Sequence, residues 1–517
     1  MRAGPVIRSS IAAFMVAGFL LVAVTLAGAA TLVASDEGWS QYQGDAQHTG
    51  VAPSAPAAPF RVAWTKNTGI GDETHFAGIP APVILGDDAI VVDREDVTAV
   101  SLTTGQVDWT IPKALGPSAP AAVVRSGNRQ ILVFTEGGGD LSSSAGGTPT
   151  PSPSGGTSSA GCSASSSGTP TPTPAVSESP AASGSPSAPE RPALVAVDAA
   201  THEQLWRSPL TDVSIGGPTV DGSTVLVGAD DGCVTALALD TGHLEWSVDL
   251  GNNVNTPIAA ADGTAFVTVG AGAREAPSVV ALRESDHVDL WRTQLGAAGS
   301  SIGAPVVVDG TVYVAVNDGS IHAVEATDGS SRWAARLNTV SGGGAPAVSS
   351  DAVVIADVRG QVYRFDPADG HRTWDFAMNV PVYASAVIAG SSVLVGDSDG
   401  TINAIDLQTG ERIARSDVGD GLLLGLAVAP QTVVATRTGP AAGLVALVAD
   451  PSGVLTREQS PTIVEPVQLG LFWLAAAIPL VVLLVLAGRF LDARLGPTSL
   501  GTGEGDEDIE PFEDDLV

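Results

Sequence analysis

Two cysteines, seven histidines and several aspartate-rich turns are the residues of this 517-residue chain that could bind a metal or take part in catalysis. The aspartate-rich turns are Asp230-Asp231-Gly232, Asn317-Asp318-Gly319 and Asp397-Ser398-Asp399-Gly400. Their residue types resemble those of a calcium-binding loop, but none has the glycine and distant glutamate that such a loop requires. Since Asp, Asn and Gly also favour tight turns, we interpret all three as hairpin turns.

The histidines are scattered along the chain. His243 and His371 each follow the glycine of a turn in separate repeats, so we expect them at an outer rim, too far apart to share a metal. The sequence also contains no His-Glu-x-x-His or phosphate-loop pattern. We therefore predict no catalytic residue, no metal site and no cofactor-binding residue.

The two cysteines stand in different surroundings. Cys162 lies in a tract rich in Ser, Gly, Pro and Thr, residues 139–190, and Cys233 follows an Asp-Asp-Gly turn. In an oxidising compartment they could form a disulfide that holds the tract against the adjacent repeat. Two free thiols are the alternative, and the sequence leaves this choice open.

Tryptophans recur at a nearly constant interval. Five of them are separated by 40, 45, 42 and 41 residues: Trp206, Trp246, Trp291, Trp333 and Trp374. Trp64 and Trp109 are 45 residues apart, and the 97 residues between Trp109 and Trp206 fall to 45 once the 52-residue tract 139–190 is removed. A period of about 40 to 45 residues is typical of four-stranded propeller blades.

Each repeat contains β-branched runs separated by turns that end in glycine, as four short strands require. We count eight repeats and predict an all-β, eight-bladed propeller. Seven blades stay an alternative because the last repeat is degenerate, and the seventh has Ala414 where its tryptophan should be. Residues 60–64 precede the first repeat, and we expect them to close the ring by joining the last blade.

The stretch from Ala238 to Trp246, which reads Ala-x-Asp-Thr-Gly-x-x-x-Trp, resembles the PQQ-like (quinoprotein alcohol dehydrogenase-like) β-propeller repeats of bacterial proteins. Residues 39–50 are similar to the segment that opens many such propellers. The resemblance implies that tryptophans and glycines of successive blades stack and lock the blades together. These residues are Trp109, Trp206, Trp246, Trp291, Trp333, Trp374, Gly105, Gly242, Gly329, Gly370 and Gly410.

Enzymes of this family bind pyrroloquinoline quinone (PQQ) with calcium, and several have a disulfide between adjacent cysteines. This chain has no Cys-Cys pair, no segment that matches the calcium ligands, and lysines only at Lys66 and Lys113. Since one fold hosts many functions, the resemblance alone does not imply an enzyme. Because these features of the cofactor site are missing, we expect no catalysis. A PQQ-dependent oxidoreductase, with PQQ and calcium as cofactors, is the alternative.

Two apolar runs, residues 11–34 and 469–487, are long enough to cross a bilayer. Arginines precede the first run and follow the second, so we expect both chain ends in the cytoplasm, where basic flanks are enriched. A cleaved signal peptide is the alternative for the first run, because Ala27-Gly28-Ala29 is a small-residue site. We expect the first run to be an uncleaved anchor in the cell membrane, with the propeller on the extracytoplasmic side.

The chain is thus expected to have six parts. These are a signal anchor (1–35), a leader (36–59), the propeller (60–458) with a disordered insert (139–190), a linker (459–468), a second transmembrane helix (469–488) and an acidic cytoplasmic tail (489–517). The insert resembles O-glycosylated stalk sequence, and an unmodified spacer is the alternative.

The net charge of −32 argues against nucleic acid as a partner. We predict a membrane-anchored scaffold that binds an envelope protein or another ligand without catalysis. A further alternative is an envelope sensor that signals through its acidic tail.

Overall fold

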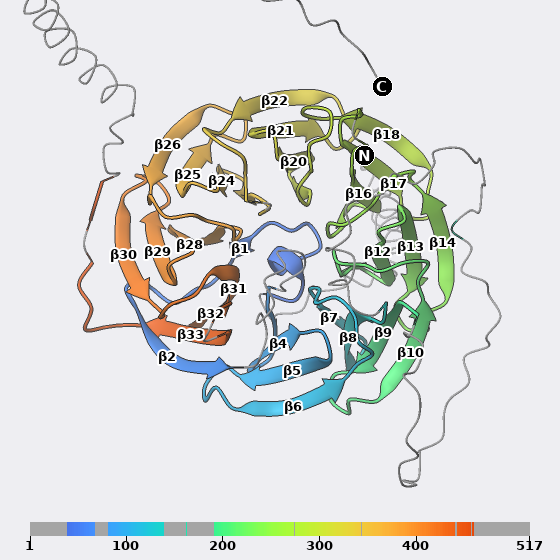
Figure 1. Ribbon diagram of the computed structural model, residues 1–517, viewed down its shortest axis with the longest axis horizontal. Helices are drawn as coiled ribbons and strands as arrows, with labels where there is room; N and C mark the ends of the chain where they lie inside the picture. The colour runs from blue at the N-terminus through green and yellow to red at the C-terminus, as the bar shows by residue number, and fades with distance from the viewer. Residues whose placement is uncertain are drawn as a thin grey trace, which may run out of the picture. The chain divides into compact units, whose positions relative to one another are not determined.

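The computed structural model describes residues 39–67, 81–138, 162 and 191–459, except residues 273, 343, 440, 441 and 456. Eight separate β-sheets follow one another around a central axis, as Figure 1 shows. The prediction of an eight-bladed β-propeller is therefore confirmed, and the seven-bladed alternative was wrong.

The strands of the first four blades run outward from the axis in chain order. Blade 1 contains β3 (Val83–Leu85), β4 (Asp88–Val92), β5 (Asp96–Ser101) and β6 (Val107–Pro112), and blade 2 contains β7 (Ala122–Ser126), β8 (Arg129–Glu136), β9 (Ala193–Asp198) and β10 (Gln204–Pro209). Blade 3 contains β11 (Pro218–Asp221), β12 (Thr224–Gly228), β13 (Cys233–Ala238) and β14 (Leu244–Asp249), and blade 4 contains β15 (Ala259–Ala261), β16 (Thr264–Val269), β17 (Ser278–Arg283) and β18 (Asp289–Gln294).

The remaining blades repeat this order until the last. Blade 5 contains β19 (Val306–Val308), β20 (Thr311–Val316), β21 (Ser320–Glu325) and β22 (Ser331–Arg336), and blade 6 contains β23 (Ala347–Ser349), β24 (Ala352–Ala356), β25 (Gln361–Phe365) and β26 (Arg372–Ala377). Blade 7 contains β27 (Val387–Ala389), β28 (Ser392–Gly396), β29 (Thr401–Asp406) and β30 (Arg412–Asp417), and blade 8 contains β31 (Leu423–Ala429), β32 (Thr432–Arg437) and β33 (Gly443–Ala449).

The middle strands of each blade are buried on both faces because every sheet packs against two neighbours. All six residues of β20 are buried, which explains why these strands read as continuous Val, Ile and Ala runs instead of alternating apolar and polar residues. The apolar core accordingly lies between the blades.

Blade 8 takes its outer strand from the start of the chain. The strand β2 (Phe60–Asn67) pairs antiparallel with β33, with Phe60 opposite Ala449 and Lys66 opposite Leu444. The expectation that this stretch closes the ring is confirmed. The pairing also explains why the last repeat has no tryptophan of its own, because Trp64 supplies it.

Every outer strand has an irregular register at the residue before its tryptophan, or before Ala414 in blade 7. In blade 3, for example, Ala236 pairs with Trp246 and Leu237 pairs with Leu244, so Glu245 is left out of the ladder. Such a bulge re-aims the neighbouring side chain, and here it accompanies a tryptophan that reaches the next blade.

Within the described residues, no helix is long and apolar enough to cross a membrane. The two predicted membrane segments, nearly all of the insert, and the acidic tail lie outside those residues. The domain boundaries predicted for them stay predictions.

Candidate functional site

The joints between blades are built from tryptophan side chains. The indole N–H of Trp206 donates to the carbonyl of Leu239 in the next blade over 2.6 Å, and that of Trp291 donates to Ala326 over 2.9 Å. The indoles of Trp64, Trp246, Trp333 and Trp374 make equivalent bonds.

A glycine in the following blade lies under most of these rings. A Cβ atom added to Gly242 would lie 2.5 Å from the ring of Trp206, and Gly242 has a φ of +63°. At position 242 the ring of Trp206 leaves no room for a Cβ atom, and the left-handed backbone favours glycine. The same contact pairs Gly105 with Trp64, Gly329 with Trp291, Gly370 with Trp333, and Gly410 with Trp374.

Two of the tryptophan joints use histidine where the other five use glycine. His202 has a φ of +61° and lies 4.6 Å from Trp109 between ring centroids, and His287 has a φ of +53° and lies 5.7 Å from Trp246. The sequence reasoning missed both. Their spacing from the tryptophan that follows, four residues as for Gly242, was the signal available.

The joint between blades 7 and 8 has no tryptophan. The turn that would receive it does not exist, because the outer strand of blade 8 comes from the start of the chain. Other contacts hold the joint: Ser416 donates its hydroxyl to the carbonyl of Phe60, and Arg412 forms an isolated β-bridge and an ion pair with Glu458. Ala414 is therefore a consequence of ring closure.

Residues 39–52, which we call the axial segment, lie at the centre of the ring (blue in Figure 1). They include the short 3₁₀ helix η1 (Tyr42–Gly44) and the strand β1 (Val51–Ala52), which pairs parallel with β27. The innermost strand of each of blades 1 to 7 donates a backbone N–H to this segment, in chain order. The donors are Ile84, Val123, Val220, Ala260, Val307, Val348 and Ile388, and the acceptors are Trp39, Ser40, Gln41, Ala46, Gln47, Thr49 and Gly50.

This arrangement has a simple physical reason. An innermost strand is the edge of its sheet, so its N–H groups that face the axis have no partner within the blade. Buried donors without acceptors are costly, and the axial segment supplies acceptors at distances of 2.7–3.0 Å. From the sequence we expected a leader that is similar to the opening segment of PQQ-like propellers, and its position at the axis of the ring was not expected.

Several side chains of the axial segment are buried, among them Trp39, Gln41 and His48. The ring of His48 is fully buried, with Nδ1 3.0 Å from the carbonyl oxygen of Pro305 and Nε2 3.4 Å from the hydroxyl of Thr219. Burial lowers the pKa of His48 to about 4, although the bond to Pro305 opposes this shift. Tyr42 meets the imidazole edge-on at 5.1 Å, and burial raises the pKa of its hydroxyl.

The aspartate-rich turns use their carboxylates internally. Asp397 accepts the backbone N–H groups of Asp399 and Thr401 and the side-chain amide of Asn403. In blade 5, the hydroxyl of Ser320 lies 2.5 Å from Asp318 and 2.8 Å from Nε2 of His322. The serine stands between the carboxylate and the imidazole, which is not the order that activates a nucleophile.

A bound quinone with calcium would need a free axis and free carboxylate ligands. The axis of the ring is filled by residues 39–52, and the turn carboxylates already accept hydrogen bonds from their own turns. Among the described residues, no group of three or more His, Cys, Asp or Glu could hold a metal ion. The side chains that the structure describes therefore do not fit pyrroloquinoline quinone with calcium.

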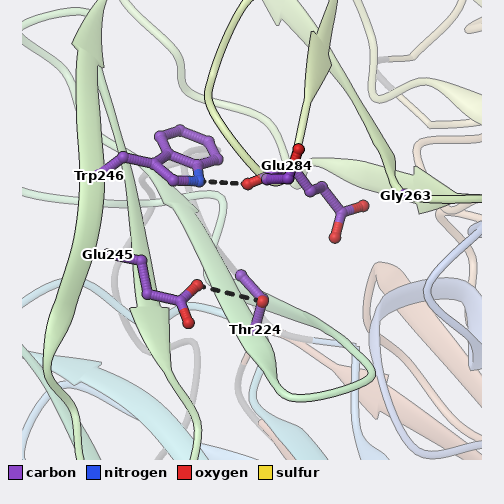
Figure 2. A pocket seen from close by; sticks show the side chains of 6 residues that line it. Thr224, Glu245, Trp246, Gly263 and Glu284 are labelled. Carbon is purple, nitrogen blue, oxygen red and sulfur yellow. Dashed lines mark hydrogen bonds between the residues drawn. The ribbon is translucent and has the colours of Figure 1, made fainter.

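An open cavity of about 530 Å³ lies between blades 3 and 4 (Figure 2). Its lining residues are Thr224, Glu245, Trp246, Gly263, Glu284 and Ser285. Glu245 accepts a hydrogen bond from the hydroxyl of Thr224, and the indole of Trp246 donates to the carbonyl of Glu284. The cavity therefore has two carboxyl groups and an indole in its wall.

Among the residues that the structure describes, neither Glu284 nor Asp221 has a basic partner that would favour its charged form. Burial and, to a smaller extent, the nearby Asp221 and Glu245 carboxylates together raise the pKa of Glu284 to about 7. Burial also raises the pKa of Asp221. A cationic group in the cavity would favour ionisation of both.

Cys162 and Cys233 form a disulfide, with an S–S distance of 2.02 Å and a Cα–Cα distance of 5.8 Å. Cys233 is buried at the start of β13. The bond ties one residue of the blade 2 insert to blade 3.

Residues 190–275 and 275–422 match the sequence model of a family described as outer membrane protein assembly factor BamB. BamB of Yersinia pestis is 30% identical over 171 residues, which are 30% of this chain and 42% of that protein. BamB of Taylorella asinigenitalis (strain MCE3) is 36% identical over 50 residues, which are 10% of this chain and 13% of that protein. The chain thus matches less than half the length of these curated relatives.

Solved structures share the fold at low sequence identity. BamB from Moraxella catarrhalis has a TM-score of 0.50 and 18% identity, and the match covers 76% of this chain and 100% of that one. Quinohemoprotein alcohol dehydrogenase from Comamonas testosteroni has a TM-score of 0.55 and 12% identity, with 79% and 80% covered. An assembly factor and an enzyme have the same fold, so fold alone does not assign the function.

Proposed function

We propose that this chain, whose residues 190–422 carry PQQ-like repeats, is a non-catalytic scaffold that binds another protein in the cell envelope. The observation that carries the proposal is the axial segment. It occupies the centre of the ring and bonds to seven blades, so the turns and the rim are left for recognition. Propeller turns form a broad docking surface of this kind.

The sequence matches support the same function. The family model and both curated relatives are named as assembly factors of outer membrane proteins. We extend to this chain only the general role of protein binding during assembly at a membrane. In our proposal, residues 11–34 and 469–487 anchor it, with the propeller outside the cytoplasm.

The area around the cavity between blades 3 and 4 is our candidate docking surface. Leu244, Val288 and Leu290 on these blades are 40%, 45% and 40% exposed. The carboxyl groups of Glu245 and Glu284 lie in the cavity wall. Exposed apolar side chains on the same two blades as these acidic groups fit a partner segment that presents a basic residue flanked by apolar ones.

Site-specific photocrosslinking in cells tests this surface. A photoreactive phenylalanine at Leu290 should give one dominant crosslinked partner. The matched control is Thr373, the exposed residue at the same bulge position in blade 6, and it should give none. Adding Glu245→Gln and Glu284→Gln should weaken the Leu290 crosslink, because the charge that attracts the partner is removed. Equal crosslinking at both positions, or no effect of the glutamine substitutions, would contradict the proposal.

A further inference from the structure

The axial segment contacts the ring as a bound peptide would. Its main-chain carbonyls accept one N–H from each of six inner strands, and Val51 and Ala52 add a short parallel strand to β27. Addition of an extended segment to sheet edges is a common mode of peptide recognition. Here the edges come from successive blades instead of one sheet.

Two side chains of the segment make contacts that main-chain pairing does not provide. The carboxamide of Gln41 accepts from the N–H of Val220 over 2.7 Å and donates to its carbonyl over 2.9 Å. Seven residues later, the imidazole of His48 lies between the carbonyl of Pro305 and the hydroxyl of Thr219. Blades 3 and 5 therefore recognise an amide and an imidazole at a fixed spacing.

Small residues are also required at two positions. A Cβ atom on Gly44 would lie 3.2 Å from the ring of Trp39, and one on Gly50 would lie 3.0 Å from Ala347. Both glycines have positive φ, +97° and +65°. Ala347 of blade 6 thus favours glycine at position 50, whereas Gly44 is required by Trp39 of the segment itself.

We propose that the axis of the ring is a peptide-binding site, that residues 39–52 are its resident ligand, and that a separate peptide of this sequence binds there in trans. The segment is joined to β2 by residues 53–59, in which Pro53 and Ser54 are exposed. No disulfide holds it, because the two cysteines of the chain are bonded to each other. Its attachment to the ring is therefore non-covalent apart from this linker.

Cleavage of the linker after folding tests the proposal. A specific protease site is inserted after Ser54 in the full chain, which is purified in detergent and then cut. A fluorescent peptide of residues 36–52 is added, and binding is followed by anisotropy. We expect the cut leader to stay with the ring and to exchange with the labelled peptide until binding saturates at one peptide per ring. The uncut chain should not bind the peptide, because its axis is filled.

The matched control is the same peptide with Gln41→Ala and His48→Ala, which should bind at least about tenfold more weakly because both side-chain contacts are lost. Equal binding of the two peptides would overturn the proposed side-chain recognition. Loss of the leader on cleavage without rebinding of the peptide would overturn the site itself. Collapse of the ring on cleavage, detected by near-ultraviolet circular dichroism, would also overturn it, because the segment would then be an inseparable part of the fold.

Discussion

Replacing Trp206 by alanine removes a side chain that is 4% exposed and that joins blades 2 and 3. The loss of a buried tryptophan costs about 3 to 5 kcal/mol in a core that cannot collapse around the cavity. Part of that cost is the carbonyl of Leu239, which loses the indole N–H at 2.6 Å. Trp206→Phe keeps an apolar ring and should cost less, about 1 to 2 kcal/mol.

A substitution of Gly242, the residue in contact with the Trp206 ring, tests the joint more strongly. Gly242→Ala places a Cβ atom 2.5 Å from the Trp206 ring at a φ of +63°, so it should be costly in the natural chain. In the Trp206→Ala background the clash is gone and only the backbone strain is left, about 1 to 2 kcal/mol. The double-mutant cycle should therefore give a coupling of about 1 to 3 kcal/mol.

Urea unfolding followed by far-ultraviolet circular dichroism measures these differences without depending on tryptophan fluorescence. Leu244→Ala, at a residue that is 40% exposed, is the control and should change the unfolding free energy by less than about 0.5 kcal/mol. A loss below about 1 kcal/mol for Trp206→Ala, or additive effects of the two substitutions, would refute the role of this joint.

Three further predictions concern the ring closure, the axis and the membrane. Ala414→Trp should destabilise the protein by about 1 to 3 kcal/mol, because Ala414 is 4% exposed and blade 8 has no turn to receive the ring; stabilisation in urea unfolding would contradict this explanation. The pKa of His48 is lowered to about 4 by burial, so its contribution is complete above the ordinary pKa of about 6.5 and is lost as the pH falls toward 4, by about 3 kcal/mol in total. His48→Gln should remove this part of the pH dependence, and equal slopes for the two proteins would contradict the assignment. Reporter fusions after Val517 and at Ser165 should report opposite sides of the membrane, and the same side for both would contradict the proposed topology.

The sequence was sufficient to predict the fold because the blade repeat is carried by large residues at a regular spacing. The tryptophan period predicted the blades, and the stray strand at Phe60 predicted the ring closure. His202 and His287 escaped notice because a motif based on glycine does not include other residues that accept a positive φ.

The axial segment and the cavity could not be found in the same way. The segment binds mainly through main-chain carbonyls, which every residue has, so its sequence has no period to detect. The cavity is formed by residues of two blades, and Thr224 and Glu284 are 60 positions apart in the chain. Only the ring geometry brings them together.

The central claim is that this propeller has a filled axis and binds proteins instead of a redox cofactor. The most direct test is titration of the purified full chain with pyrroloquinoline quinone and calcium, followed by absorbance and by dye-linked oxidation of alcohols and sugars. We predict no saturable binding and no turnover, because residues 39–52 occupy the axis. Stoichiometric binding with turnover would contradict the account and support the oxidoreductase alternative.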